Sequence, residues 1–133
     1  MNYKKFNSLT FQDIFKFIVQ LKKRIMVLPY TFLFLAIILE VVGTLFLRDT
    51  DGFTKMIPNL VVVFSYATSF YFLSLTFQHI SVSVAYAIWS GIGIVLIAIL
   101  GAIKYQEFPS LLVSFGILLI VTGVILVLAN TAN

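Results

Sequence analysis

The chain has 133 residues and a formal net charge of +4, with nine Lys and Arg against five Asp and Glu. Hydrophobic residues make up 61% of it, charged residues make up 11%, and its mean hydropathy is +1.08. A soluble domain is about half apolar and a quarter charged, and so short a chain has too little interior to hide the excess. The composition excludes a soluble enzyme and predicts a protein embedded in lipid.

The N-terminal segment, residues 1–24, differs from the rest because it holds six of the nine basic residues: Lys4, Lys5, Lys16, Lys22, Lys23 and Arg24. Apolar residues recur at helical spacing opposite its polar ones, at Phe11, Ile14, Phe15, Ile18 and Leu21. Thr10 and Asp13 have the spacing of a capping box. We expect a basic amphipathic helix in the membrane interface. A signal peptide is the alternative that we reject, because a full span follows without a small-residue cleavage site.

Residues 25–133 form the predicted membrane domain. Residues 56–103 contain no Asp, Glu, Lys or Arg, and as one helix they would reach about 70 Å, more than twice the thickness of a hydrocarbon core. The stretch must therefore fold back at the polar residues 78–81. The spans of the predicted all-α protein are about 28–47, 57–77, 82–103 and 109–129, with Pro29 in the first turn of the first span.

The basic residues predict the orientation of the chain. The N-terminal side carries six of them, and the opposite side carries Arg48, Lys55 and Lys104. This bias places both termini in the cytoplasm if residues 1–24 are translated, whereas a start at Met26 would reverse it. With the segment present, every copy should share one orientation, which disfavours an antiparallel homodimer. The net positive charge suits anionic lipid, and we expect no nucleic-acid partner.

Glu40 is the residue that carries chemistry. It lies about 18 Å from one end of the first span and about 10 Å from the other. A carboxylate at that depth is costly unless it faces a cavity, pairs with a cation or takes up a proton. Its neighbours at helical spacing, Ala36, Gly43 and Thr44, are small or polar. A group that holds either a proton or a cation supports exchange of the two, and the alternative is a protonated Glu that joins helices by a hydrogen bond.

Aromatic residues share faces of the middle spans. Tyr86, Trp89 and Gly93 lie on one face of the third span, and Tyr66 and Phe70 lie in the second. Aromatic rings beside a carboxylate suit an organic cation, although ordinary packing is the alternative in so aromatic a chain.

The fourth span carries Gly116 and Gly123 two turns apart, which favours a dimer seam over packing within one chain. The sequence shows no nucleophile–base pair, metal-ligand cluster or phosphate-binding loop, so we expect neither enzymatic activity nor a cofactor. The proposed exchange at Glu40 makes protons the expected coupling ion.

Three segments resemble the small multidrug resistance transporters: residues 39–44 (LEVVGT), 52–54 (GFT) and 85–93 (AYAIWSGIG). The resemblance implies an antiparallel dimer of four-helix protomers whose two Glu40 carboxylates bind substrate and protons in turn. It places Ala36, Ile37, Thr44, Tyr66, Tyr86 and Trp89 at or near the binding chamber. It implies a kink at Gly91 and Gly93 that lets the dimer alternate its access.

Two branches of that family remain open. Gly43 is similar to the branch that exports quaternary ammonium compounds, whereas Ser81 and Ser83 look more like the branch that exports polyamines as paired subunits. The first hypothesis is a proton-coupled antiporter for hydrophobic organic cations in the cytoplasmic membrane. The alternatives are a polyamine exporter in a heterodimer with a similar chain, and a non-transporting partner subunit.

Overall fold

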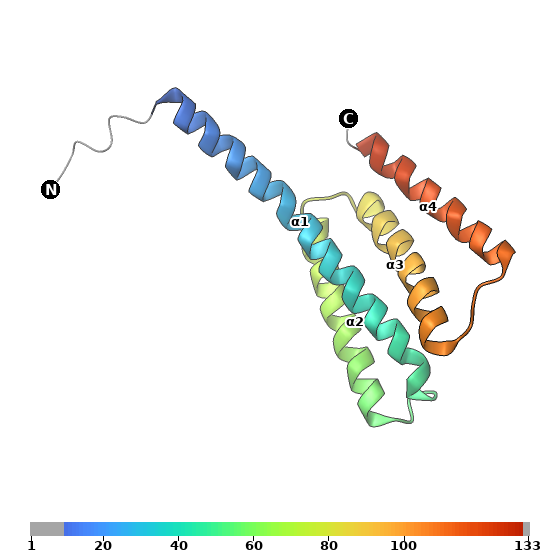
Figure 1. Ribbon diagram of the computed structural model, residues 1–133. Helices are drawn as coiled ribbons and strands as arrows, with labels where there is room; N and C mark the ends of the chain where they lie inside the picture. Colours follow the sequence, from blue (N-terminus) through green and yellow to red (C-terminus); the bar gives the residue numbers. More distant parts are fainter. Residues whose placement is uncertain (1–9, 132–133) are drawn as a thin grey trace.

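The computed structural model describes residues 10–131, apart from the side chains of residues 22–26 and 131. Its elements are α1 (Phe11–Leu47), the 3-10 helix η2 (Arg48–Thr50), α2 (Met56–Phe77), α3 (Val82–Tyr105) and α4 (Leu111–Thr131) (Figure 1). Four stretches are long and apolar enough to cross a bilayer: Val27–Thr50, Met56–Phe77, Val82–Tyr105 and Leu111–Asn130. The prediction of an all-α protein with four transmembrane helices is confirmed.

Helix α1 is longer than the first predicted span. It has 37 residues and begins at Phe11, where the Asp13 carboxylate accepts a hydrogen bond from the Thr10 backbone N–H at 3.1 Å. The helix continues past residue 24, so the expected boundary between the N-terminal segment and the membrane domain is not marked by a break. Lys4 and Lys5 lie outside the described residues, as do the side chains of the other basic residues at 22–24.

The predicted position of Pro29 was wrong. It lies inside α1 rather than in a first turn, because the amphipathic helix and the first span are joined into one. A proline inside a helix removes the hydrogen bond to the carbonyl four residues earlier and crowds that carbonyl. Pro29 is buried, and its own carbonyl accepts a hydrogen bond from Thr76 Oγ1 of α2 at 3.4 Å. The helix is thus joined to α2 at the place where its internal bonding is weakest.

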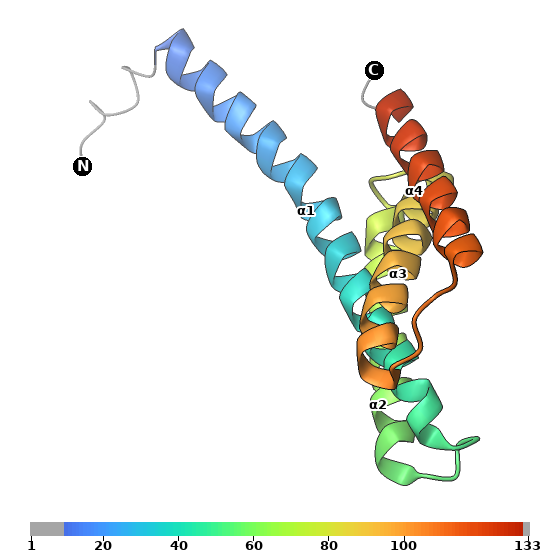
Figure 2. The same ribbon diagram turned by 45° about the vertical axis from the view of Figure 1, so that its right-hand side comes forward.

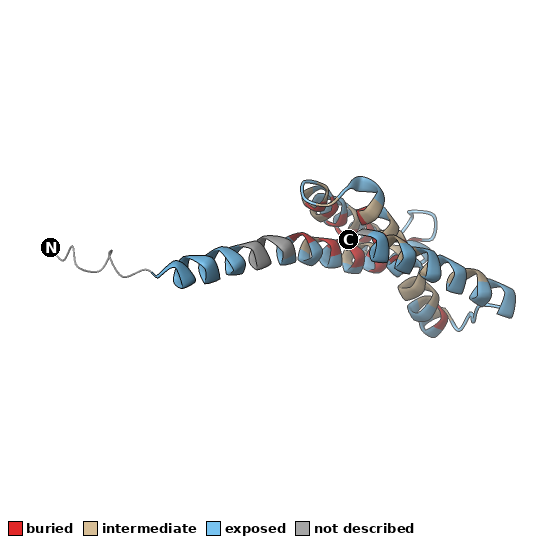
Figure 3. Cartoon of the chain, turned by 90° about the horizontal axis from the view of Figure 1, so that it is seen from above, coloured by how far each residue is buried: buried red, intermediate tan, exposed pale blue. Residues whose placement is uncertain are grey.

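The helices are arranged in an open bundle. α1 and α2 lie side by side and α3 packs on α1, while α4 contacts α3 alone among the described elements (Figures 1 and 2). Viewed from above, buried residues lie on α1, α2 and α3, and α4 is mostly exposed (Figure 3). A large part of α4 is therefore free to contact lipid or another chain.

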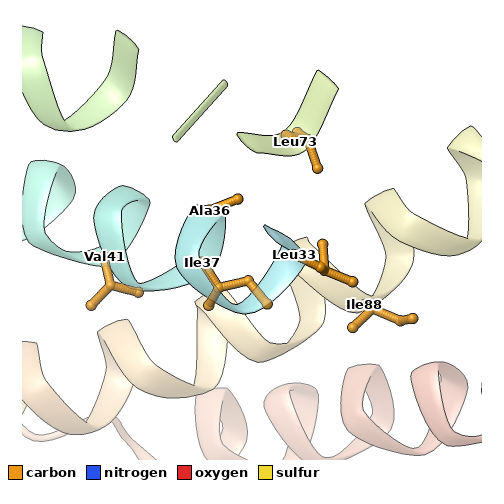
Figure 4. Close-up of a cluster of buried hydrophobic side chains, with 6 residues drawn as sticks. All are labelled: Leu33, Ala36, Ile37, Val41, Leu73 and Ile88. Carbon is orange, nitrogen blue, oxygen red and sulfur yellow. The ribbon is translucent and has the colours of Figure 1, made fainter. Parts of the chain in front are cut away.

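The core lies where α1 meets α2 and α3. Its buried side chains come mainly from one face of α1, with one from each neighbouring helix: Leu33, Ala36, Ile37, Val41, Leu73 and Ile88 (Figure 4). A polar stripe on α2 faces the same helix, and Ser69 Oγ donates to the Ala36 carbonyl at 2.6 Å. Polar groups in lipid must find partners within the protein, so this bond fixes the position of α1 on α2.

Charged residues at the end of the bundle opposite the termini link α1, η2 and α3. Lys104 of α3 forms an ion pair with Asp49 and donates to the Leu45 carbonyl at 2.9 Å. Tyr105 Oη donates to the same carbonyl and lies 3.3 Å from the other Asp49 oxygen. These contacts hold the C-terminal ends of α1 and α3 together, close to Glu40.

Candidate functional site

Glu40 lies half-buried on α1, with its carboxylate held from the same helix. Thr44, one turn further on, donates a hydrogen bond from Oγ1 to Glu40 Oε1 at 2.7 Å. The same hydroxyl lies 2.9 Å from Tyr66 Oη of α2, where either atom can donate. The four-residue spacing of Glu40 and Thr44 places both side chains on one face of α1, and Tyr66 joins that pair across the helix interface.

A cavity of about 490 Å³ opens beside this carboxylate. Its lining comes from three helices: Glu40 and Thr44 of α1, residues of α3 including Trp89, Ser90 and Gly93, and Val113 and Ile117 of α4. Among the described residues that line it, Glu40 alone is charged. An apolar cavity of this size that contains one carboxylate suits a bulky, lipophilic cation.

Two glycines let the helices approach each other around the carboxylate. A β-carbon at Gly93 of α3 would lie 3.1 Å from Glu40 Oε2, so the missing side chain is the space that the carboxylate fills. A β-carbon at Gly43 would lie 3.2 Å from the Ser65 β-carbon and 3.6 Å from the Tyr66 ring. Gly93 is predicted as part of a kink. In the structure, it lies where α3 passes close to the Glu40 carboxylate.

The four predicted aromatic residues form one continuous row. The ring centroids of Tyr66 and Phe70 are 6.5 Å apart, those of Phe70 and Trp89 are 6.1 Å apart, and those of Trp89 and Tyr86 are 5.4 Å apart. The row crosses from α2 to α3 and reaches the cavity at Trp89. Spacing along each helix predicts the two halves of the row, and the structure joins them.

Other predicted chamber residues lie elsewhere. Ala36 and Ile37 do not line the cavity, because they are 0% and 3% exposed within the core between α1 and its neighbours. In this conformation they belong to the buried core cluster that supports the helix carrying Glu40. Gly91 is buried against α4, where an added β-carbon would overlap the Val124 side chain.

The predicted seam residues face open space in the protomer. β-carbons at Gly116 and Gly123 would meet no atom within 4 Å. These glycines are therefore not needed for packing within the described part of the chain. Within the same residues, no group of three His, Cys, Asp or Glu is placed to hold a metal ion.

Sequence reasoning missed the wall that α4 contributes. Val113 and Ile117 line the cavity together with Ile94, Ile97 and Ala98 of α3. Their apolar side chains are indistinguishable from lipid-facing ones in the sequence, and α4 is apolar on every side. The short last loop could have predicted this wall, because a connection of that length returns α4 along α3.

Comparison with known proteins identifies the family. The family model for small multidrug resistance proteins matches residues 28–120. A membrane protein of Bacillus subtilis, YvaE, is 49% identical over 72% of this chain and 81% of its own length. The quaternary ammonium compound-resistance protein QacH of Staphylococcus saprophyticus is 40% identical over 74% of this chain and 92% of its own. The multidrug resistance protein EbrA of Bacillus atrophaeus is 44% identical over 76% of this chain and 96% of its own length. The predicted resemblance is confirmed: the chain belongs to the small multidrug resistance family of multidrug efflux transporters and is a multi-pass protein of the cytoplasmic membrane.

Proposed function

We propose that the protein is a proton-coupled antiporter that exports hydrophobic or quaternary organic cations. The observation that carries this proposal is the position of Glu40, which among the described lining residues is the one charged group in a cavity of about 490 Å³ that is otherwise mostly apolar. Such a carboxylate needs a positive partner or a proton, since a lone charge in low-dielectric surroundings is costly. Within the part of the chain that the structure describes, no Lys or Arg lines the cavity to serve as that partner.

The exchange follows from competition for one group. A proton on Glu40 removes the negative charge that attracts a cation, and a bound cation favours the deprotonated form. Thr44 donates to Oε1, so one carboxylate oxygen keeps a hydrogen bond in the charged state, while Oε2 faces Gly93. Each exported cation would therefore be replaced by protons from the other side of the membrane.

The row of aromatic rings supplies the affinity for organic cations. Trp89 lines the cavity, and Tyr86 and Phe70 pack against it. The ring faces attract a quaternary ammonium group without the hydrogen bonds that a polyamine or guanidinium needs. The names of relatives such as QacH, which refer to resistance to quaternary ammonium compounds, support the same substrate class.

The proposed working unit is a dimer, with Gly116 and Gly123 on its seam. Both glycines have open space beside them, and α4 packs on α3 alone within the described elements. An apolar helix with small residues on a free face is suited to close pairing with another helix in lipid. The two subunits are either antiparallel copies of this chain or this chain and a similar one.

Transport into vesicles tests the proposal. Purified protein is reconstituted into liposomes with an imposed pH gradient, and uptake of a radiolabelled quaternary ammonium compound is compared with uptake of guanidinium and spermidine. We expect gradient-driven uptake of the quaternary compound, and none after Glu40→Gln. Glu107→Gln is the matched control, because that carboxylate forms an exposed ion pair with Arg48 outside the cavity. Proton-coupled uptake that persists in Glu40→Gln would overturn the proposal, and uptake of spermidine alone would favour the polyamine branch.

A further inference from the structure

The beginning of α1 forms a surface that no other described part of the chain covers. Residues 11–21, called the N-terminal arm below, are all exposed. The arm extends away from the other three helices, as the blue end of α1 shows (Figures 1 and 2). It precedes the family match, which begins at residue 28. The arm is thus an addition to the transport domain rather than part of its packing.

The arm has two chemically different faces. Exposed apolar side chains cover a broad arc of it, at Phe11, Ile14, Phe15, Phe17, Ile18 and Leu21. Gln12, Lys16 and Gln20 lie on the remaining arc. Ile18 and Gln20 point in nearly opposite directions, since two residues turn a helix by about 200°. So many apolar side chains on one exposed face need a partner.

The charge of this region identifies the kind of partner. Lys16 lies in the arm, and Lys22, Lys23 and Arg24 follow it before the span begins at Val27. Asp13 is the single acidic residue among residues 11–26. A second copy of the arm would bring like charges together, whereas anionic headgroups would neutralise them. An amphipathic helix with basic residues beside its apolar face is typical of a helix lying in the membrane interface.

The length of α1 carries the arm beyond the hydrocarbon core. At about 1.5 Å per residue, a helix of this length spans about 55 Å, well beyond the roughly 30 Å of a hydrocarbon core. If α1 stayed straight and upright, the apolar face of the arm would stand in water. Pro29 provides a weak point, since it removes a backbone hydrogen bond within the helix while its carbonyl holds the bundle side of α1 on α2.

We propose that the N-terminal arm is a membrane anchor that lies flat on the leaflet at its end of the transporter and binds anionic lipid. α1 bends near Pro29, the apolar face enters the acyl boundary, and Lys16 contacts the headgroups, to which the positive charge of residues 22–24 attracts the arm. The arm thereby adds a lipid-binding function to the transport domain.

Site-specific fluorescence on the full chain tests this proposal. The chain contains no cysteine, so Ile18→Cys and Gln20→Cys each give one attachment point for an environment-sensitive dye. Both variants are reconstituted into vesicles of phosphatidylcholine alone and of an equal mixture with phosphatidylglycerol. In the mixture, we expect brominated acyl chains to quench the dye at position 18 several-fold more than the dye at position 20. We expect aqueous iodide to show the reverse order.

Charge removal and dilution give the decisive comparisons. Replacing Lys16, Lys22, Lys23 and Arg24 with Gln should remove most of the lipid quenching at position 18, because each basic residue near an anionic surface contributes to binding. The protein that keeps its four basic residues is expected to show the same loss of quenching in vesicles of phosphatidylcholine alone. Equal iodide quenching at both positions, or lipid quenching that ignores lipid charge, would overturn the proposal. Protection at position 18 that disappears as the protein is diluted in lipid would instead assign the arm to a second copy. Glu40→Gln should change none of these signals, so the result is independent of the transport mechanism.

Discussion

Gly93 of α3 faces Glu40 of α1 so closely that a β-carbon there would lie 3.1 Å from the carboxylate oxygen Oε2. The absence of a side chain on one helix thus makes room for the charged group on another. Thr44 and Tyr66 hold the opposite side of the carboxylate through a chain of two hydrogen bonds. Glu40 is therefore positioned by three helices, although its own helix carries it.

Gly93→Ala should weaken cation binding without unfolding the protein. The new methyl group must displace the Glu40 carboxylate, and overpacking of this kind costs about 1–3 kcal/mol, or roughly fivefold or more in Kd. Isothermal titration with a quaternary ammonium compound measures the effect. Gly101→Ala is the matched control on the same helix, since a β-carbon there would meet nothing within 4 Å. Equal Kd values for the two variants would contradict the assigned role of Gly93.

Gly91→Ala should loosen the contact between α3 and α4. The added methyl group would overlap the Val124 side chain, so we expect a loss of about 1–3 kcal/mol in stability. Thermal unfolding of the detergent-solubilised protein measures the loss. Because the conflict involves one neighbour, Val124→Ala should restore much of the stability in the double variant. Additive losses from the two substitutions would show that Gly91 acts elsewhere.

Gly123→Leu should break the dimer and leave the protomer folded. Nothing within the described chain fills the space beside Gly123, so the larger side chain has room until a second α4 approaches. Cross-linking in lipid and circular dichroism report dimer and helix content separately. Ile125→Phe adds bulk to an exposed residue well away from the glycine face, and it should leave the dimer intact. A Gly123→Leu variant that still forms the dimer would move the seam away from this face.

Asp49→Asn should lower stability more than Asp51→Asn. Asp49 is bonded to both Lys104 and Tyr105 of α3, while Asp51 lies 3.8 Å from Lys55 and is more exposed. Partly exposed ion pairs contribute little to stability, so the expected shift in melting temperature is small but measurable. The same shift for both variants would mean that the contacts between α1 and α3 at this end do not stabilise the fold.

The number of helices and the depth of Glu40 within a membrane-spanning helix could be predicted from the sequence because both depend on where charge is absent. A long run without charged residues predicts helices that span the membrane. A carboxylate inside such a run has only a few possible roles. The spacing of Tyr86 and Trp89 likewise predicts that they share one face of a helix, and in the structure their ring centroids lie 5.4 Å apart. These are properties of single helices.

The remaining features depend on how helices meet. Ala36 shares a face with Glu40 by spacing, yet it is buried against α2 while Glu40 borders the cavity. The apolar wall from Val113 and Ile117 required knowing which side of α4 faces α3. Pro29 was misplaced because a proline is favoured in a first turn, and nothing local shows that the helix beginning at Phe11 continues without a break into the first span.

Proton release on substrate addition tests the central claim most directly. Weakly buffered, detergent-solubilised protein is mixed with a quaternary ammonium compound while the pH is recorded, and the experiment is repeated with Glu40→Gln and Glu107→Gln. Competition at Glu40 predicts proton release from the parent protein and from Glu107→Gln, and none from Glu40→Gln. Release of the same size from Glu40→Gln would show that protons and cations compete elsewhere, and would contradict the account.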